Sequence, residues 1–297
     1  MKRLLFILAA AALVLPLSSS SCKKQDDPTP KDVVMEPAKT ADVAKVVSFE
    51  LVSGATPRYI SKEGKEYDVL SIEFTEDSRY ILRRRPVITA SSVTKAESGV
   101  EVVTGKFTES GGKYTCQGAF EATVEPKGSD SAVISVNGKT QTASAKVTST
   151  PQTTNSNKTN ADRTWKVDNS IIKISGSGVN IDMGFKGCDL YQIAQYAKEN
   201  GASVDPSKLT GYSITEIMFT GNNTMTISFA GQPSFYGEYT LSGNNINYRL
   251  TVGSNELLQT SANGTISFPA QGKATLILNS SLKGYSGSIE FALSQAN

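Results

Sequence analysis

Apolar and polar residues alternate along most of this chain, and such alternation favours β-strands over helices. The clearest run is "INYRL", in which Ile246, Tyr248 and Leu250 fall on one face while Asn247 and Arg249 fall on the other. Similar short runs follow one another, separated by Asn-Gly, Asn-Asn or Gly-Gly pairs that tolerate the positive φ of tight turns. The pattern predicts many short antiparallel strands, each with one dry and one wet face.

Two pairs of segments repeat this pattern in the same order. "IEFTEDSRYIL" (72–82) aligns with "IMFTGNNTMTI" (217–227), and "GKFTESGGKY" (105–114) aligns with "GEYTLSGNNI" (237–246). The offset is 145 residues for the first pair and 132 for the second, so the first copy carries about 13 extra residues. We therefore predict an all-β protein with two tandem copies of about eight strands. Each copy is an antiparallel meander closed as a barrel or folded as a sandwich.

One segment, "CDLYQIAQYAKENG", departs from the strand pattern. Asp189 is suited to cap a helix, and Asn200-Gly201 is suited to end it. The apolar residues between them share one stripe of a helix: Leu190, Ile193, Ala194 and Ala197. We predict a helix of about ten residues in the second copy alone. It is either a lid over a barrel mouth or, the interpretation that we favour, a plug packed on the barrel.

The apolar run near the start has the layout of a secretory signal. Lys2 and Arg3 precede the run 4–17, and small serines then lead to Cys22. A cysteine placed directly after small residues resembles the lipobox of bacterial lipoproteins, particularly those of Bacteroidota, although Ser19 stands where that family usually has leucine. The resemblance implies that the leader is removed and that Cys22 is acylated. An ordinary signal with an incidental cysteine is the alternative.

Charged residues follow the cysteine as "KKQDD", residues 23–27. This tract is similar to the one that sends lipoproteins of Bacteroidota to the cell surface. We therefore expect a lipid-anchored protein of the outer membrane that faces outward, with the periplasmic leaflet as the alternative. Several acyl chains on one residue give a stable anchor, since one chain alone holds only marginally.

Composition shifts mark the domain boundaries. Residues 23–44 contain three prolines and few large apolar residues, which is typical of a tether. Residues 148–162 lack large apolar residues and are typical of a linker. The predicted segments are a signal peptide at 1–21, a flexible tether at 22–44, a first β-meander domain at 45–147, the linker at 148–162 and a second β domain at 163–297.

The second copy begins with "RTWKV", which holds the only tryptophan of the chain, Trp165. A tryptophan on a first strand, followed by "FTGNNTMTISF" and "YGEYTLSGNNINY", resembles the lipocalin-like domains of Bacteroidota lipoproteins. The resemblance covers residues 164–297 best and the first copy weakly. Arg163 stands where lipocalins have a glycine. The resemblance implies a barrel able to hold a small ligand.

Charge and composition exclude several classes of function. Without the signal the chain has 276 residues, with 28 basic and 28 acidic side chains, and it lacks the basic surface that a nucleic-acid partner needs. The absence of histidine excludes Ser-His-Asp catalysis, HExxH zinc sites and most transition-metal sites. Glu73, Glu76 and Asp77 lie close together, but alternation places Glu73 on the wet face and the other two in a turn. We predict no enzyme activity, no metal and no cofactor.

Candidate ligand contacts come from the inward faces of the predicted strands. In the second domain the expected lining is Met225, Ile227, Tyr239, Tyr248 and Leu250. In the first copy Arg84 aligns with Phe229, so it is either a cation at a cavity mouth that binds carboxylate or phosphate or, the interpretation that we favour, part of a solvated basic strand end. Cys116 and Cys188 are either two separate thiols, which we favour, or an interdomain disulfide.

Two functions are compatible with the sequence, and we favour the first. The first is a non-enzymatic lipoprotein that binds a small apolar or glycan-like ligand inside its barrels. The second is a structural or adhesive envelope module without an internal ligand, because eight-stranded barrels can be filled by their own side chains. The sequence does not indicate a protein partner.

Overall fold

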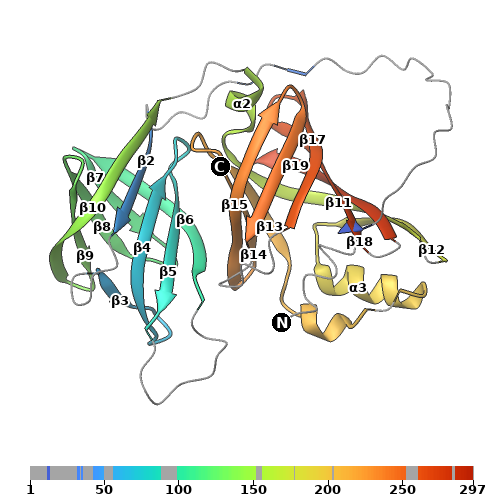
Figure 1. Ribbon diagram of the computed structural model, residues 1–297, viewed down its shortest axis with the longest axis horizontal. Coiled ribbons are helices and arrows are strands. Elements are labelled where there is room, and N and C mark those ends of the chain that lie inside the picture. Colours follow the sequence, from blue (N-terminus) through green and yellow to red (C-terminus); the bar gives the residue numbers. More distant parts are fainter. Residues whose placement is uncertain are drawn as a thin grey trace.

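The computed structural model describes residues 12–13, 32–33, 35, 43–49, 56–87, 99–151, 156–176, 178–202, 204–251, 260–282 and 285–296. Two eight-stranded antiparallel barrels follow one another along the chain (Figure 1). The predicted all-β class with two tandem meander barrels is therefore confirmed. The signal peptide and Cys22 lie outside the described residues, apart from a two-residue strand, β1 (Ala12–Leu13), which pairs with β19.

The first barrel is a simple meander. Its strands are β2 (Val43–Phe49), β4 (Glu66–Phe74), β5 (Arg79–Pro86), β6 (Glu101–Ser110), β7 (Lys113–Gln117), β8 (Ala122–Lys127), β9 (Ser131–Val136) and β10 (Lys139–Pro151). The ring closes because β2 pairs with both β10 and β4. A short strand, β3 (Arg58–Ile60), adds to β4 outside the ring.

The second barrel repeats this topology. Its strands are β11 (Thr164–Gly176), β13 (Ile214–Phe219), β14 (Thr224–Phe229), β15 (Gln232–Ser242), β16 (Asn245–Thr251), β17 (Thr260–Ala270), β18 (Lys273–Leu282) and β19 (Tyr285–Gln295). The first strand again closes the ring, since β11 pairs with β13 and β19. Beyond residue 168, β11 leaves β13 and pairs instead with β12 (Val179–Lys186).

The sequence repeat corresponds to equivalent hairpins. In both copies the turn between the aligned strands begins with a threonine whose hydroxyl accepts the backbone N–H four residues later. The N–H of Arg79 donates to Thr75 at 3.0 Å, and the N–H of Thr224 donates to Thr220 at 3.3 Å. One residue before each donor the backbone takes a positive φ, 60° at Ser78 and 61° at Asn223. A tight turn is thus confirmed at the Asn-Asn pair 222–223, one of the pairs expected to form such turns.

The glycine shared by the second pair of segments also has a structural reason. A Cβ added to Gly237 would lie 1.8 Å from the carbonyl oxygen of Arg249 on the neighbouring strand. A Cβ added to Gly105 would lie 2.5 Å from the ring of Tyr80. Glycine therefore occupies the same place in both barrels because a side chain would collide with a neighbouring strand.

The predicted helix is α3 (Leu190–Glu199), whose N-cap Asp189 accepts the N–H groups of Tyr191 and Gln192. Its predicted stripe is buried in the core of the second barrel, as the plug interpretation expects. A 3-10 turn, η1 (Pro206–Leu209), follows. The predicted linker contains a further helix, α2 (Ser156–Ala161), which was not expected. Figure 1 shows α2 at the upper end of the second barrel and α3 near the lower end.

The barrels contact each other through equivalent strands. The guanidinium of Arg83 lies 5.2 Å from the ring centre of Tyr236, and the hydroxyls of Thr104 and Ser228 are 3.2 Å apart. In the aligned copies Ser228 is the counterpart of Arg83, and Tyr236 is the counterpart of Thr104. The contact of Arg83 with Tyr236 and the contact of Ser228 with Thr104 are therefore equivalent, with the roles of the two barrels exchanged. Such reciprocal contacts are the property of a two-fold interface.

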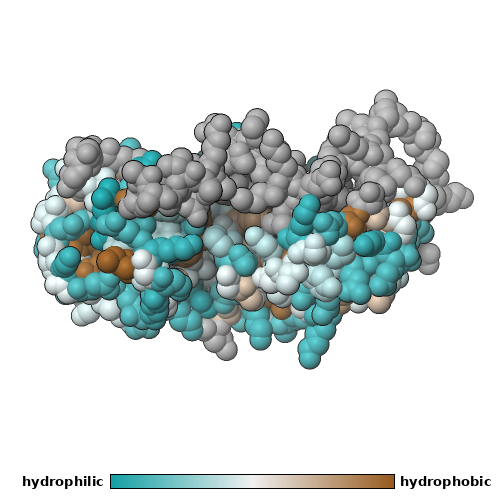
Figure 2. Space-filling model, turned by 90° about the horizontal axis from the view of Figure 1, so that it is seen from below, coloured by the Kyte–Doolittle hydropathy of each residue, from teal (hydrophilic) through white to brown (hydrophobic). Residues whose placement is uncertain are grey.

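An apolar cluster occupies the middle of this contact: Ile81, Val102 and Met218 are buried there, and Tyr236 packs against them. We refer to the contact between the outer faces of β4–β6 and β13–β15 as the junction. Among the described residues on the face seen from below, Figure 2 shows mostly hydrophilic side chains, with apolar residues in small separate patches.

Candidate functional site

The five residues predicted to line a cavity in the second barrel do point inward, and they share one core. Met225 and Ile227 expose none of their surface, Tyr239 exposes 1%, Leu250 3% and Tyr248 9%. A fully buried side chain borders no void that admits a water molecule. At the level of β14, therefore, the barrel is filled.

Large aromatic side chains provide the filling. Trp165, Phe219, Phe268 and Phe291 are all fully buried in the same core. The ring of Phe219 meets that of Tyr239 edge to face at 5.0 Å. Each such ring buries a large apolar area, which stabilises the packed barrel.

The hydroxyl of Tyr239 belongs to a polar cluster at the α2 end of this barrel. It donates to Asp162, and the ammonium of Lys158 lies 3.0 Å from it and 3.2 Å from the same carboxylate. Lys158 also donates to the carbonyl of Thr220 at 3.2 Å. Burial raises the pKa of Asp162, and burial together with the Asp162 charge raises that of Tyr239 well above its usual value. Tyr239 therefore remains a protonated donor.

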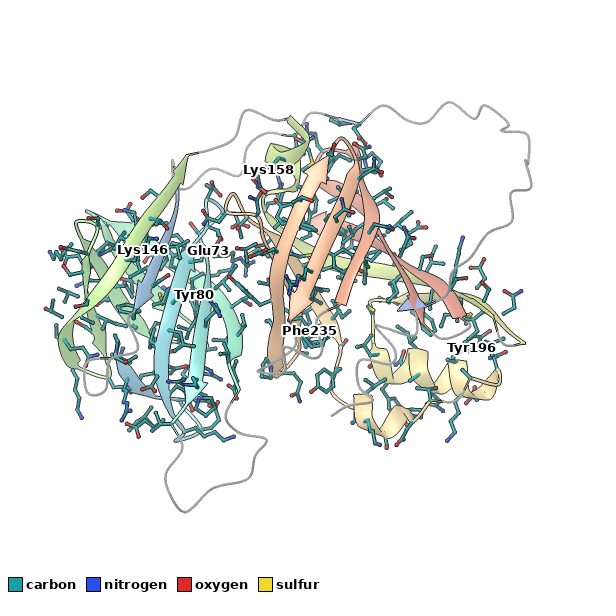
Figure 3. All side chains as sticks on the ribbon, in the orientation of Figure 1. Glu73, Tyr80, Lys146, Lys158, Tyr196 and Phe235 are labelled. Atoms are coloured by element: carbon teal, nitrogen blue, oxygen red, sulfur yellow. The ribbon has the colours of Figure 1, made fainter. Side chains whose placement is uncertain are left out.

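Glu73 faces this second barrel from β4. Its carboxylate accepts hydrogen bonds from Thr220 at 2.5 Å, Asn222 at 3.0 Å and Thr224 at 2.9 Å. Only 5% of Glu73 is exposed, and burial raises its pKa although the three donors oppose the shift. The expectation of a wet face for Glu73 was wrong: the side chain does point out of its own barrel, but the other barrel covers it. Figure 3 shows Glu73 on the side of the first barrel that faces the second, and Lys158 on α2.

The turn after β4 places two more carboxylates beside the junction. Asp77 accepts the backbone N–H of Thr164 at 2.6 Å, at the start of the second barrel. Glu76 is 5% exposed, and burial raises its pKa to about 7, with the charges of Asp162 and Asp77 adding to the shift and Lys158 opposing it. Glu76 therefore changes its protonation near neutral pH. The alternation of apolar and polar residues in the sequence did not indicate that Glu76 would be buried and change its protonation in this range.

A second charged group occupies one end of the first barrel. The favoured expectation of a solvated strand end was wrong for Arg84, which is only 9% exposed: it points inward, as Phe229 does, and donates to Tyr59 at 2.6 Å. Its guanidinium pairs with Glu101 at 2.9 Å and lies 3.9 Å from the ring centre of Tyr67. The carboxylate that Arg84 holds in this structure thus comes from the protein itself.

The two cysteines of the described barrels are separate. Cys116 and Cys188 are both buried and unpaired, and burial raises the pKa of each thiol to about 12. Both are therefore poor nucleophiles at neutral pH.

Within the described residues, no group of three or more acidic or cysteine side chains is arranged to hold a metal ion. In the same part of the chain, no helix combines the length and the apolar character needed to cross a membrane.

The sequence did not predict the polar residues that meet between the barrels, because these residues come from both copies and from the linker. One local signal was available: Lys158 and Asp162 are four residues apart, which is the spacing of an ion pair on a helix. Comparison with protein-family models, with curated proteins and with solved structures gave no match to this chain.

Proposed function

We propose that the mature protein is a non-enzymatic lipoprotein of the bacterial outer membrane, anchored through acyl chains on Cys22 and facing the cell exterior. The apolar leader, the small residues before the cysteine and the charged tract after it support this proposal. The two barrels are then the folded body that the anchor holds at the membrane.

Of the two functions left open by the sequence, we propose the structural or adhesive module. The observation that carries this choice is the complete burial of Met225 and Ile227, the residues expected at the centre of a ligand cavity. Their packing leaves no internal space at that level, so a binding partner would meet the outer surface of the barrels.

Metabolic labelling with an alkyne-bearing fatty acid tests the anchor. The wild-type protein should incorporate the label and remain with the membrane fraction, whereas Cys22→Ser should lose both properties. Cys116→Ala is the matched control, because it removes a buried thiol and leaves Cys22 in place. Label on Cys22→Ser would contradict the anchor.

Native mass spectrometry of the mature protein, released after Cys22 from its own cells, tests the choice of function. A mass equal to that of the polypeptide alone is expected. Reproducible excess mass that is shed on unfolding would contradict the filled barrel and would favour a carrier of a small apolar or glycan-like ligand.

A further inference from the structure

Three residues of the predicted tether lie on the second barrel. We call Asp32, Val33 and Met35 the clasp. One oxygen of the Asp32 carboxylate accepts the backbone N–H of Phe268 at 2.7 Å, and the other accepts the side-chain amide of Asn244 at 2.6 Å. The clasp therefore bonds to two strand ends of the barrel, on β17 and at the turn before β16.

The clasp also bonds to α2 through one side chain. Asn160 accepts the N–H of Met35 at 2.9 Å and donates to the carbonyl of Val33 at 3.0 Å. The N–H of Val33 donates to the carbonyl of Phe268 at 2.9 Å. These bonds satisfy both backbone groups of Val33 and the N–H of Met35, as a strand partner would.

Apolar packing adds to the hydrogen bonds. Met35 is only 3% exposed and belongs to the core of the second barrel. Asn160 is 2% exposed, so the polar contact that holds Met35 is itself shielded from water. Shielding of this kind makes the loss of either partner costly.

The position of the clasp changes where the chain is tethered. The chain enters the first barrel at Val43, so a free tether would join that barrel to the anchor. Instead, among the described residues, the first fixed point after Cys22 is on the second barrel, at the end where α2 lies. Asp32 is ten residues after Cys22, and a fully extended chain of that length spans at most about 35 Å.

We propose that the clasp sets the orientation of the protein on the membrane, with the α2 end of the second barrel facing the bilayer and the α3 side facing away. This rests on the acylation of Cys22 proposed above. Without the clasp, the chain from Cys22 to Val43, which is 21 residues further on, would span at most about 75 Å, enough for the body to turn freely. The clasp shortens that reach to less than the length of β11, whose 13 residues extend about 43 Å.

Fluorescence energy transfer in vesicles tests the orientation. A donor dye is attached to Ser242→Cys, an exposed site at the end of β15 beside Asn244, or to Lys198→Cys, an exposed site on α3. The acylated protein is bound to phosphatidylethanolamine vesicles that carry an acceptor dye on a fraction of the headgroups. The native thiols of Cys116 and Cys188 are buried and should not react.

Transfer from residue 242 should exceed transfer from residue 198 at least twofold. The double variant Asp32→Ala/Met35→Ser should remove most of that difference, while Asp26→Ala, which removes a carboxylate between the anchor and the clasp, should preserve it. Equal transfer from both sites of the vesicle-bound protein would overturn the orientation and leave the anchor standing. Failure of the wild-type protein to bind vesicles would overturn both.

Hydrogen exchange of the mature protein without acyl chains tests the clasp alone. The amides of Val33 and Phe268 should exchange at least a hundredfold more slowly than in an unstructured peptide, and the double variant should lose this protection at Val33. Exchange of Val33 at the peptide rate in the wild-type protein would overturn the proposal whatever the state of Cys22.

Discussion

Three donors of the second barrel converge on the carboxylate of Glu73, so the junction depends on this residue directly. Glu73→Ala should lower the free energy of unfolding by about 2 to 3 kcal/mol, because it leaves buried donors without an acceptor. Glu66→Ala, on the exposed part of the same strand, should change it by less than about 0.5 kcal/mol. Urea denaturation measures both, and equal effects would show that Glu73 is not held by the junction.

Glu76 should make stability depend on pH. Burial raises its pKa from 4.5 to about 7. The folded protein therefore keeps a proton that the unfolded chain releases, so this group contributes stability in acid, and the contribution is lost as the pH rises through 7. Between about pH 5 and about pH 8 the wild-type protein should lose about 1 to 2 kcal/mol more stability than Glu76→Gln.

The control for this experiment is Glu121→Gln, because Glu121 is exposed and pairs with exposed Lys62. It should follow the wild-type curve. A Glu76→Gln protein with the wild-type pH dependence would show that another group takes up the proton. The buried Asp162 beside Glu76 would then be the first candidate.

At the scale of elements, the pairing of β15 with β16 requires a glycine at position 237. Gly237→Ala should destabilise the protein by more than about 3 kcal/mol, because its Cβ would lie 1.8 Å from a backbone oxygen that cannot move without breaking the pairing. Gly184→Ala on β12 is the matched control, since its Cβ would contact no atom within 4 Å. Thermal unfolding followed by circular dichroism would separate the two, and a stable Gly237→Ala protein would refute the close approach.

The strands, their turns and α3 were predictable because local patterns determine them. Alternation identifies the inward face of a strand such as β16, and a capping residue such as Asp189 identifies a helix start. Alternation does not show whether the outward face meets water or another domain, so the burial of Glu73 and Met218 was not predictable. The contacts of Met35 were equally hidden, because its partner Asn160 lies 125 residues away.

At the scale of the whole molecule, the buried junction should make the two barrels unfold together. Trp165 is the only tryptophan and reports on the second barrel alone, whereas circular dichroism reports on both. The midpoints of the two signals should coincide in the wild-type protein. They should separate in Met218→Lys, which buries a charge in the apolar centre of the junction.

Met183→Lys is the control for this variant, because Met183 is exposed on β12 and lies away from the junction. Its two midpoints should still coincide. Separate midpoints in the wild-type protein would mean that the barrels are independent folding units despite their contact.

The two-fold relation between the barrels has a consequence for how the chain can evolve. In a homodimer every interface residue appears twice, so a carboxylate at the place of Glu73 would have its own copy at the counterpart position. Here that counterpart is Met218, and the residues around it supply hydroxyl and amide donors instead. When two copies lie in one chain, mutation can place an acid in one copy and its hydrogen-bond donors at the equivalent positions of the other. The subunits of a homodimer cannot differ in this way, because they share one sequence.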